Sequence, residues 1–159
     1  MTTRAGAFHL SLEELEQTYT ADRKAAGVSS EDEHGYNITE YAAGRILAWT
    51  EVSGRHARKG GTIAGAVLFG FFDALGYMVT LAQSPKGTEA FTTDVSIHFL
   101  RPGPLGRFTI EGRALRFGRR SSVVAITVTS PEVPEGPVAS GVITFAPVFP
   151  KRAGGGAER

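Results

Sequence analysis

Residues 63–82 form the most hydrophobic stretch of the chain, and the only charged side chain among them is that of Asp73. A stretch of this length is long enough to cross a lipid bilayer. However, an aspartate at the middle of a bilayer costs about 2.5–3.5 kcal/mol, and the stretch also contains three glycines. A helix that is apolar almost all round must be enclosed by other elements. We therefore expect a long buried helix over about residues 65–83.

The composition of the chain narrows its possible partners and location. A length of 159 residues suits a single domain with a substantial core. The net charge of +1 gives no electrostatic reason to expect a nucleic-acid or membrane partner. The absence of cysteine excludes disulfides and thiolate metal sites and suits the cytoplasm, and the N-terminal residues lack the apolar core of a signal peptide. The four histidines lack the spacing of metal ligands, so we predict no bound metal.

The first 35 residues predict an N-terminal helical extension. Ser11 and Glu14 have the spacing of a capping box, in which each side chain bonds the backbone N–H of the other residue. We expect the helix to run from residue 12 to about residue 26. Gly27 follows, and glycine readily adopts the left-handed conformation in which many helices end.

After the apolar helix, the hydrophobic period changes from 3.6 to 2, which is typical of strands. In residues 90–102, the odd-numbered side chains from Thr93 to Phe99 fall on one face, and Thr92 falls on the other. Short turns connect the predicted strands, which favours antiparallel neighbours. The further strands are expected at residues 38–53, with a bulge at Gly44, and at residues 107–117, 121–130 and 137–146.

These elements predict an α+β fold in which an antiparallel sheet wraps around the long central helix. The sheet and central helix make up a domain over residues 36–148. Residues 149–159 have no apolar anchor and are expected to be disordered.

Asp73 is the strongest candidate for a catalytic residue. It lies about two turns after a glycine-rich helix start, whose free N–H groups suit a developing oxyanion. A carboxylate base or nucleophile near such a helix end is a workable site for acyl transfer. The alternative is a structural carboxylate, bonded to the backbone or to an arginine. Glycine inside a helix costs about 1 kcal/mol relative to alanine, so we expect either close packing or room for a ligand above Gly70 and Gly76.

Three segments of the chain resemble a known family when they are taken in order. GGTIAGAVLFGFFDALGY, TTDVSIHFLRP and GRRSSVVAITVT are similar to segments of the hot-dog-fold acyl-CoA thioesterases, especially the phenylacetyl-CoA thioesterase-like group. The resemblance covers about residues 40–147. It implies a hot-dog fold, assembly into a homodimer or homotetramer, and active sites at subunit interfaces. It also implies hydrolysis of an acyl-CoA to a carboxylate and coenzyme A, with no cofactor apart from the coenzyme A of the substrate.

The resemblance assigns roles to particular residues. Asp73 falls at the position of the catalytic acid, as general base or nucleophile, and Gly65 falls at that of the backbone oxyanion donor. Tyr77 or Thr80 could serve as the polar residue beside the acid. The expected substrate contacts are Thr62, Ala66, Tyr77 and Arg58 around the helix and Arg119, Arg120 and Ser121 at a strand turn, where coenzyme A phosphates or pantetheine would bind.

Two departures from the family pattern concern the entrance of the helix. Ala64 replaces a histidine that many relatives have, and Arg58 replaces an asparagine or glutamine that orients the attacking water. An arginine near Asp73 could instead pair with it and lower its pKa. A non-catalytic hot-dog protein that binds an acyl-CoA or another apolar ligand is therefore a second hypothesis. A hydratase is a weaker third, since no histidine follows Asp73 within the helix.

Three aromatic residues of the predicted helix allow two interpretations. Phe69, Phe72 and Tyr77 are consistent with an aromatic or medium-chain pocket, and equally with ordinary core packing.

Overall fold

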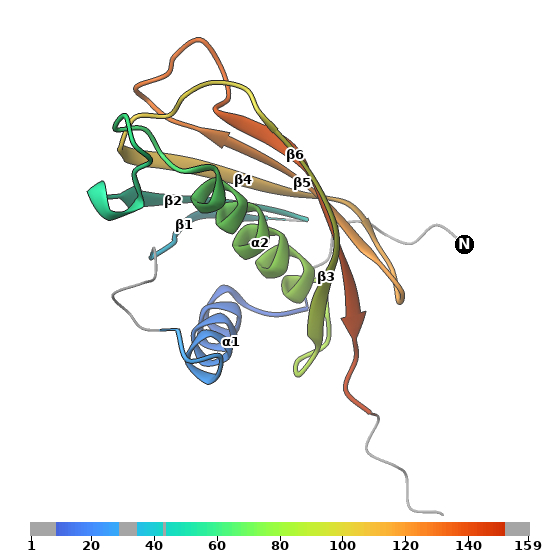
Figure 1. Cartoon of the computed structure of the whole chain (residues 1–159). Coiled ribbons are helices and arrows are strands. Elements are labelled where there is room, and N and C mark those ends of the chain that lie inside the picture. The colour runs from blue at the N-terminus through green and yellow to red at the C-terminus, as the bar shows by residue number, and fades with distance from the viewer. Residues whose placement is uncertain (1–8, 29–34, 43, 152–159) are drawn as a thin grey trace, which may run out of the picture.

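The central helix and the sheet around it define the architecture (Figure 1). The structure, a computed structural model, describes residues 9–28, 35–42 and 44–151. Its elements are α1 (Leu12–Ala25), β1 (Asn37–Ala42), β2 (Arg45–Val52), the short 3-10 helix η1 (Gly54–His56), α2 (Gly65–Ala82), β3 (Glu89–Phe99), β4 (Gly106–Phe117), β5 (Ser122–Thr129) and β6 (Ala139–Val148).

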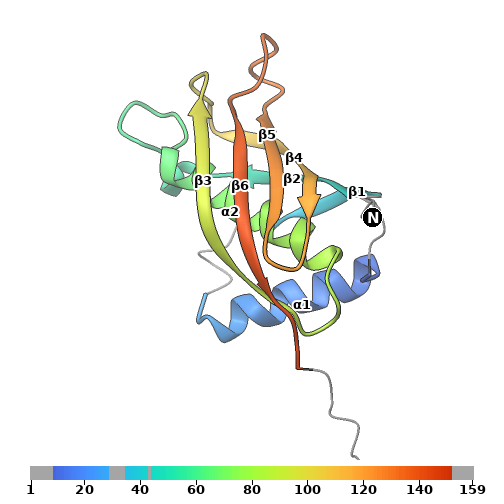
Figure 2. The ribbon, with the colours of Figure 1, turned by 90° about the vertical axis from the view of Figure 1, so that its right-hand side faces the viewer.

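Helix α2 is the predicted apolar helix, and the sheet curls around it (Figures 1 and 2). By length and composition it would pass as a membrane span, but most of it is buried inside the fold. Phe71, Phe72, Leu75 and Val79 are fully enclosed. The expected α+β hot-dog architecture, with an antiparallel sheet around a long central helix and a helix before it, is confirmed.

The sheet has the strand order β1-β2-β4-β5-β6-β3, and all its pairs are antiparallel. One expectation about connections is wrong. The turn at Pro102-Gly103-Pro104 does not join neighbouring strands, because β3 pairs with β6 and lies at the opposite edge from β1. Strand β3 therefore forms one edge of the sheet, and the segment after it crosses to the middle of the sheet, where β4 begins.

The single strand predicted over residues 38–53 is a hairpin of two strands. Ala42 of β1 lies opposite Arg45 of β2, so the chain reverses between them. Gly44 has a φ of 69°, which glycine adopts without strain and which is common in hairpin turns. The predicted bulge at Gly44 is therefore a turn.

Strand β3 contains a bulge that the alternating sequence does not reveal. Its register against β6 shifts between Thr92 and Asp94. A bulge adds one residue to a strand and reverses which side chains face the core. The predicted face is kept by Val95 and Ile97, which pack against the core, but Thr92 is turned toward α2 as well.

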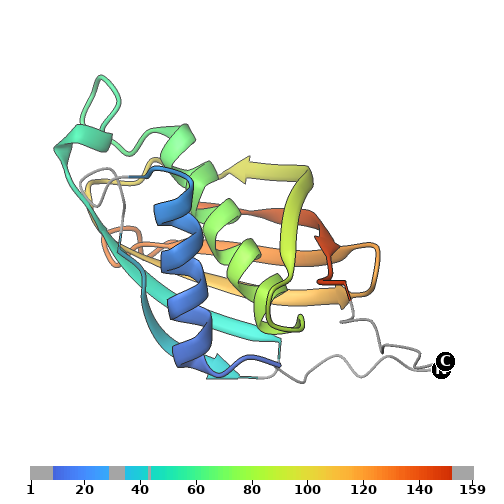
Figure 3. The ribbon, with the colours of Figure 1, turned by 90° about the horizontal axis from the view of Figure 1, so that it is seen from below.

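Helix α1 lies against α2 on the side that the sheet leaves open (Figure 3). Its N-terminal capping box between Ser11 and Glu14 is formed as predicted, and it ends close to the expected position. Leu10 and Leu15 are buried in the core. The Tyr41 hydroxyl donates a hydrogen bond of 2.8 Å to the Leu10 carbonyl, and burial raises the pKa of Tyr41 to about 12.

The ends of the proposed domains fall partly beyond the described residues. Residues 29–34 of the loop predicted over 29–35, and residues 152–159 of the tail predicted to be disordered over 149–159, lie outside them. The Phe149 ring contacts Phe117 edge to face, with centroids 6.5 Å apart.

Candidate active site

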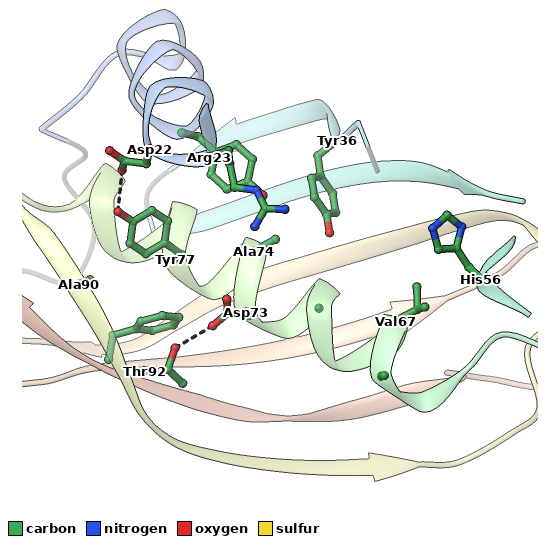
Figure 4. Close-up of a pocket in the computed structure, with 14 residues that line it drawn as sticks. Asp22, Arg23, Tyr36, His56, Val67, Asp73, Ala74, Tyr77, Ala90 and Thr92 are labelled. Carbon is green, nitrogen blue, oxygen red and sulfur yellow. Dashed lines mark hydrogen bonds between the residues drawn. The ribbon is translucent and has the colours of Figure 1, made fainter. Parts of the chain in front are cut away.

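Asp73 lies near the middle of α2 and is half-buried against β3. The hydroxyl of Thr92 donates a hydrogen bond of 2.7 Å to Asp73 Oδ1 (Figure 4). Among the described residues the other carboxylate oxygen, Oδ2, has no hydrogen-bond partner. The site therefore holds a carboxylate with one oxygen positioned and the other available to a reactant.

A cleft of about 510 Å³ opens beside Asp73. Its floor is α2, one side is β3, and the opposite side is formed by α1 and Tyr36. In Figure 4, Arg23 and Tyr36 lie above Ala74, and His56 lies at the far end above Val67. The lining residues are Tyr19, Asp22, Arg23, Tyr36, His56, Ala66, Val67, Gly70, Asp73, Ala74, Tyr77, Ala90, Thr92 and Phe145.

Tyr77 links the two helices that border the cleft. Its hydroxyl donates a hydrogen bond of 2.7 Å to Asp22 Oδ2 on α1. Burial, and then the contact with Asp22, raise the pKa of Tyr77 well above its ordinary value. Tyr77 therefore lines the cleft as expected, but it is bonded to Asp22 and not to Asp73.

The polar neighbour of the acid is therefore neither Tyr77 nor Thr80. Thr80 is fully buried and donates a hydrogen bond of 2.8 Å to Ser122 Oγ. Thr92 occupies that place, and sequence reasoning missed it because strict alternation puts its side chain on the other face of the strand.

The N-terminus of α2 forms a separate, smaller cleft of about 300 Å³. Arg58, Thr62 and Gly65 line it together with Phe99 at the end of β3. In the described part of the chain, the backbone N–H of Gly65 has no acceptor. Arg58 donates to Thr62 Oγ1 at 3.4 Å, so the considered pairing of Arg58 with Asp73 is not formed.

Gly65 and Asp73 are therefore on the same helix but not in the same cleft. Eight residues of α-helix rise by about 12 Å. A single thioester carbonyl is too small to meet the Gly65 N–H and the Asp73 carboxylate of one chain together. Ala66 lies between them and lines the larger cleft.

The predicted coenzyme A contacts lie at another part of the molecule. Arg119, Arg120 and Ser121 occupy the turn between β4 and β5, and the two arginines are exposed. Arg119 lines an open groove with Pro85, Phe149 and Lys151 near the C-terminal end of α2. The structure therefore does not bring these residues together with Asp73 within one chain.

The two phenylalanines considered for an acyl pocket lie elsewhere. Phe72 is fully buried in the core, and Phe69 is 44% exposed on α2. The aromatic residues that do line the cleft include Tyr19 and Tyr36, which no motif marked. Within residues 9–28, 35–42 and 44–151, no group of three acidic, histidine or cysteine side chains could hold a metal ion.

Comparisons with known proteins identify the superfamily and the fold that this chain resembles. Residues 60–136 match the family model of the thioesterase superfamily. The chain has the hot-dog fold of these thioesterases. The resemblance seen in the three sequence segments is thereby confirmed.

Two solved structures and one curated protein illustrate how much of this hot-dog chain is matched by its relatives. A candidate thioesterase from Silicibacter sp. TM1040 has a TM-score of 0.76 and 25% identity, over 93% of this chain and 99% of that one. A Streptococcus mutans protein, solved with acetyl-CoA bound, has a TM-score of 0.65 and 26% identity, over 72% and 90%. A candidate esterase of Saccharolobus solfataricus is 31% identical over 83 residues, which are 52% of this chain and 59% of that protein. The chain thus matches less than two thirds of the length of this curated relative.

Proposed function

We propose that this chain is a thioesterase that hydrolyses an acyl-CoA to a carboxylate and coenzyme A. The observation that carries the proposal is the Asp73 carboxylate, held by Thr92 through one oxygen and facing a cleft on the central helix of a thioesterase fold. The similar Streptococcus mutans protein binds acetyl-CoA, which supports a coenzyme A thioester as the ligand.

The reaction breaks the thioester C–S bond and adds water across it. In one route, Asp73 takes a proton from water, the hydroxide oxygen bonds to the carbonyl carbon, and the proton passes to the departing thiolate. In the other, an Asp73 oxygen bonds to the carbonyl carbon and coenzyme A leaves as the thiolate; water then cleaves the resulting anhydride, which frees Asp73 and supplies the proton for the thiolate. Both routes place negative charge on the carbonyl oxygen, which the free N–H of Gly65 can stabilise.

Two copies of the chain are needed to combine these groups, since about 12 Å separates them along one helix. Strand β3 forms an edge of the sheet in the described structure, and it carries exposed apolar side chains at Phe91 and Phe99. Unpaired, apolar strand edges tend to pair with another chain. We therefore infer a homodimer in which β3 pairs with its counterpart.

Such a dimer would bring the Asp73 carboxylate of one chain close to the Gly65 N–H of the other. Helix α2 and β3 run in opposite directions, with Gly65 beside the Phe99 ring and Asp73 beside Thr92. An antiparallel pair of β3 strands, centred near Val95 and Ser96, places Thr92 of one chain opposite Phe99 of the other. Gly65 of the partner subunit then approaches Asp73, and the dimer contains two complete sites.

The turn residues Arg119 and Arg120 are the proposed contacts for the coenzyme A phosphates. Arginine matches phosphate geometry and charge, and both side chains are exposed. The Phe149 ring and Lys151 border the same groove as Arg119. This would provide a flat apolar surface and a second positive charge for a nucleotide.

A thiol-release assay with a panel of acyl-CoAs tests the proposal. Wild type should release coenzyme A from at least one of them, and Asp73→Asn, which keeps the shape of the side chain, should lose at least about a hundredfold in kcat. Glu135→Gln, a carboxylate-to-amide change in the exposed loop between β5 and β6, is the matched control and should retain activity. Binding without turnover by wild type would favour the non-catalytic alternative.

A further inference from the structure

A second cavity lies beside the cleft that contains Asp73. It has a volume of about 360 Å³ and lies between α1, β1 and α2. Tyr19 and Tyr36 line both cavities, so their rings stand between the two spaces. The other residues around the second cavity are Leu15, Glu16, Thr20, Gly35, Ile38 and Met78.

The two tyrosines form a defined partition. Their rings contact edge to face, with centroids 6.3 Å apart and an interplanar angle of 80°. Tyr36 also contacts Phe71 edge to face at 6.2 Å, and Phe71 is fully buried in the core. Tyr36 is therefore anchored to the core, whereas Tyr19 reaches the partition from the outer helix α1.

The buried side of the second cavity is suited to hydrocarbon, whereas the exposed Glu16 and Thr20 line its solvent side. Leu15 and Met78 are buried, and Ile38 packs against the core. By contrast, the cleft in front carries Asp22, Arg23 and His56 in addition to Asp73. An acyl chain whose thioester lies at Asp73 would thus pass from a polar region into an apolar one if it could pass the two rings.

We propose that the Tyr19–Tyr36 pair limits the length of the acyl group that the site accepts. This inference rests on the proposed thioesterase function and names the residues that determine which acyl chains the enzyme accepts. With both rings in place, an acyl chain ends against them in the first cleft. Removing the Tyr19 ring joins the two cavities, and a longer linear chain can bury its terminal methylenes against Leu15, Ile38 and Met78.

The test compares wild type with Tyr19→Ala on straight-chain acyl-CoAs from acetyl to dodecanoyl. Each newly buried methylene is worth about fourfold in kcat/KM, because burial stabilises substrate and transition state alike. The ratio of kcat/KM for decanoyl-CoA to that for butyryl-CoA should therefore rise by at least about tenfold in Tyr19→Ala. Tyr19→Leu, which opens a smaller gap and keeps α1 packed, should shift the ratio in the same direction.

Two further variants make the test specific. Adding Ile38→Phe to Tyr19→Ala refills the second cavity and should reverse the gain for decanoyl-CoA. Lys24→Ala changes an exposed residue of the same helix and should leave the profile unchanged. An unchanged ratio in both Tyr19 variants, with melting temperatures near that of wild type, would overturn the proposal.

A binding measurement separates this inference from the proposed function. In the Asp73→Asn background, the ratio of the Kd values for butyryl-CoA and decanoyl-CoA should show the same dependence on Tyr19. If wild type hydrolyses nothing but Tyr19→Ala still shifts the Kd ratio, the thioesterase proposal fails and the partition stands. If wild type hydrolyses acyl-CoAs and neither ratio moves, the partition alone is wrong.

Discussion

The hydroxyl of Thr92 lies 2.7 Å from Asp73 Oδ1 and joins the edge strand β3 to the middle of α2. A hydrogen bond to an ionised group contributes more than one between neutral groups. Here it also restricts the carboxylate to one orientation in the cleft. Thr92 is therefore a positioning residue for Asp73.

Replacing Thr92 with valine removes the hydroxyl and keeps the shape of the side chain. We expect kcat for thioester hydrolysis to fall by about 10- to 100-fold, since such a bond is worth roughly 1.5–3 kcal/mol. Thr92→Ser should retain most of the activity, and Thr127→Val, the same change on strand β5 away from the cleft, should have little effect. Equal losses in the serine and valine variants would show that the bond to Asp73 is not responsible.

Gly65→Pro removes one backbone N–H and little else. Gly65 is the first residue of α2, where proline is well tolerated, and Ala64 before it already has the extended conformation that precedes proline. Losing an oxyanion donor typically costs about 100- to 1,000-fold in kcat. Gly65→Ala keeps the N–H, and its methyl group would lie 3.5 Å from the Phe99 ring, an ordinary contact. We expect the alanine variant to stay active, and an active proline variant would contradict the role of Gly65.

Mixing two inactive variants tests whether the site is shared between chains. A mixed dimer of Asp73→Asn and Gly65→Pro holds one site with both defects and one with neither. Refolding an equal mixture should restore about one quarter of wild-type activity, because half of the dimers are mixed and each has one intact site of two. Activity no higher than the sum of the separate variants would show that each site lies within one chain.

The glycines of α2 serve two different purposes. A methyl group on Gly76 would lie 2.6 Å from Ile143 Cγ2, whereas one on Gly70 would meet nothing within 4 Å. Gly76→Ala should therefore lower the free energy of unfolding by about 1–3 kcal/mol through overpacking. Gly70→Ala should raise it by up to about 1 kcal/mol, yet raise KM because its methyl group enters the cleft. Urea denaturation and steady-state kinetics on the matched pair would check both effects.

Glu111 on β4 is expected to make the free energy of unfolding fall at acid pH. Arg45 on β2 donates to it from both Nε and Nη2, at 2.8 and 2.6 Å. Hydrogen bonds from Arg45 hold the pKa of the Glu111 carboxyl below its ordinary value. The stabilisation is therefore present above the unfolded-state pKa of Glu111 and is lost as pH falls through the lower folded-state value. Glu111→Gln should cost up to about 1 kcal/mol in urea denaturation at pH 7, and a cost that persisted at pH 2 would contradict this account.

Local patterns in the sequence were enough to predict several features. The apolar length of residues 65–82 predicted the enclosed helix α2, and the spacing of Ser11 and Glu14 predicted the capping box of α1. Both features depend on residues within a few turns of one helix. The chemistry expected of Asp73 also follows from its side-chain type and from its place in an apolar helix with a glycine-rich start. The resemblance to thioesterases depended on local segments in the same way.

Features that depend on contacts between distant segments were decided by the tertiary structure. One bulge turned Thr92 toward Asp73, and periodicity cannot detect an added residue whose pairing partner is about 50 positions away. Tyr19, Tyr36 and His56 reach the cleft from separate elements, so no spacing in the chain marks them as neighbours. Conversely, Gly65 and Asp73 are close in sequence, but a rigid helix holds them about 12 Å apart along its axis. The sequence alone determined which chemical groups the protein has, and the packing of helix and sheet decided which of them can act on the same molecule.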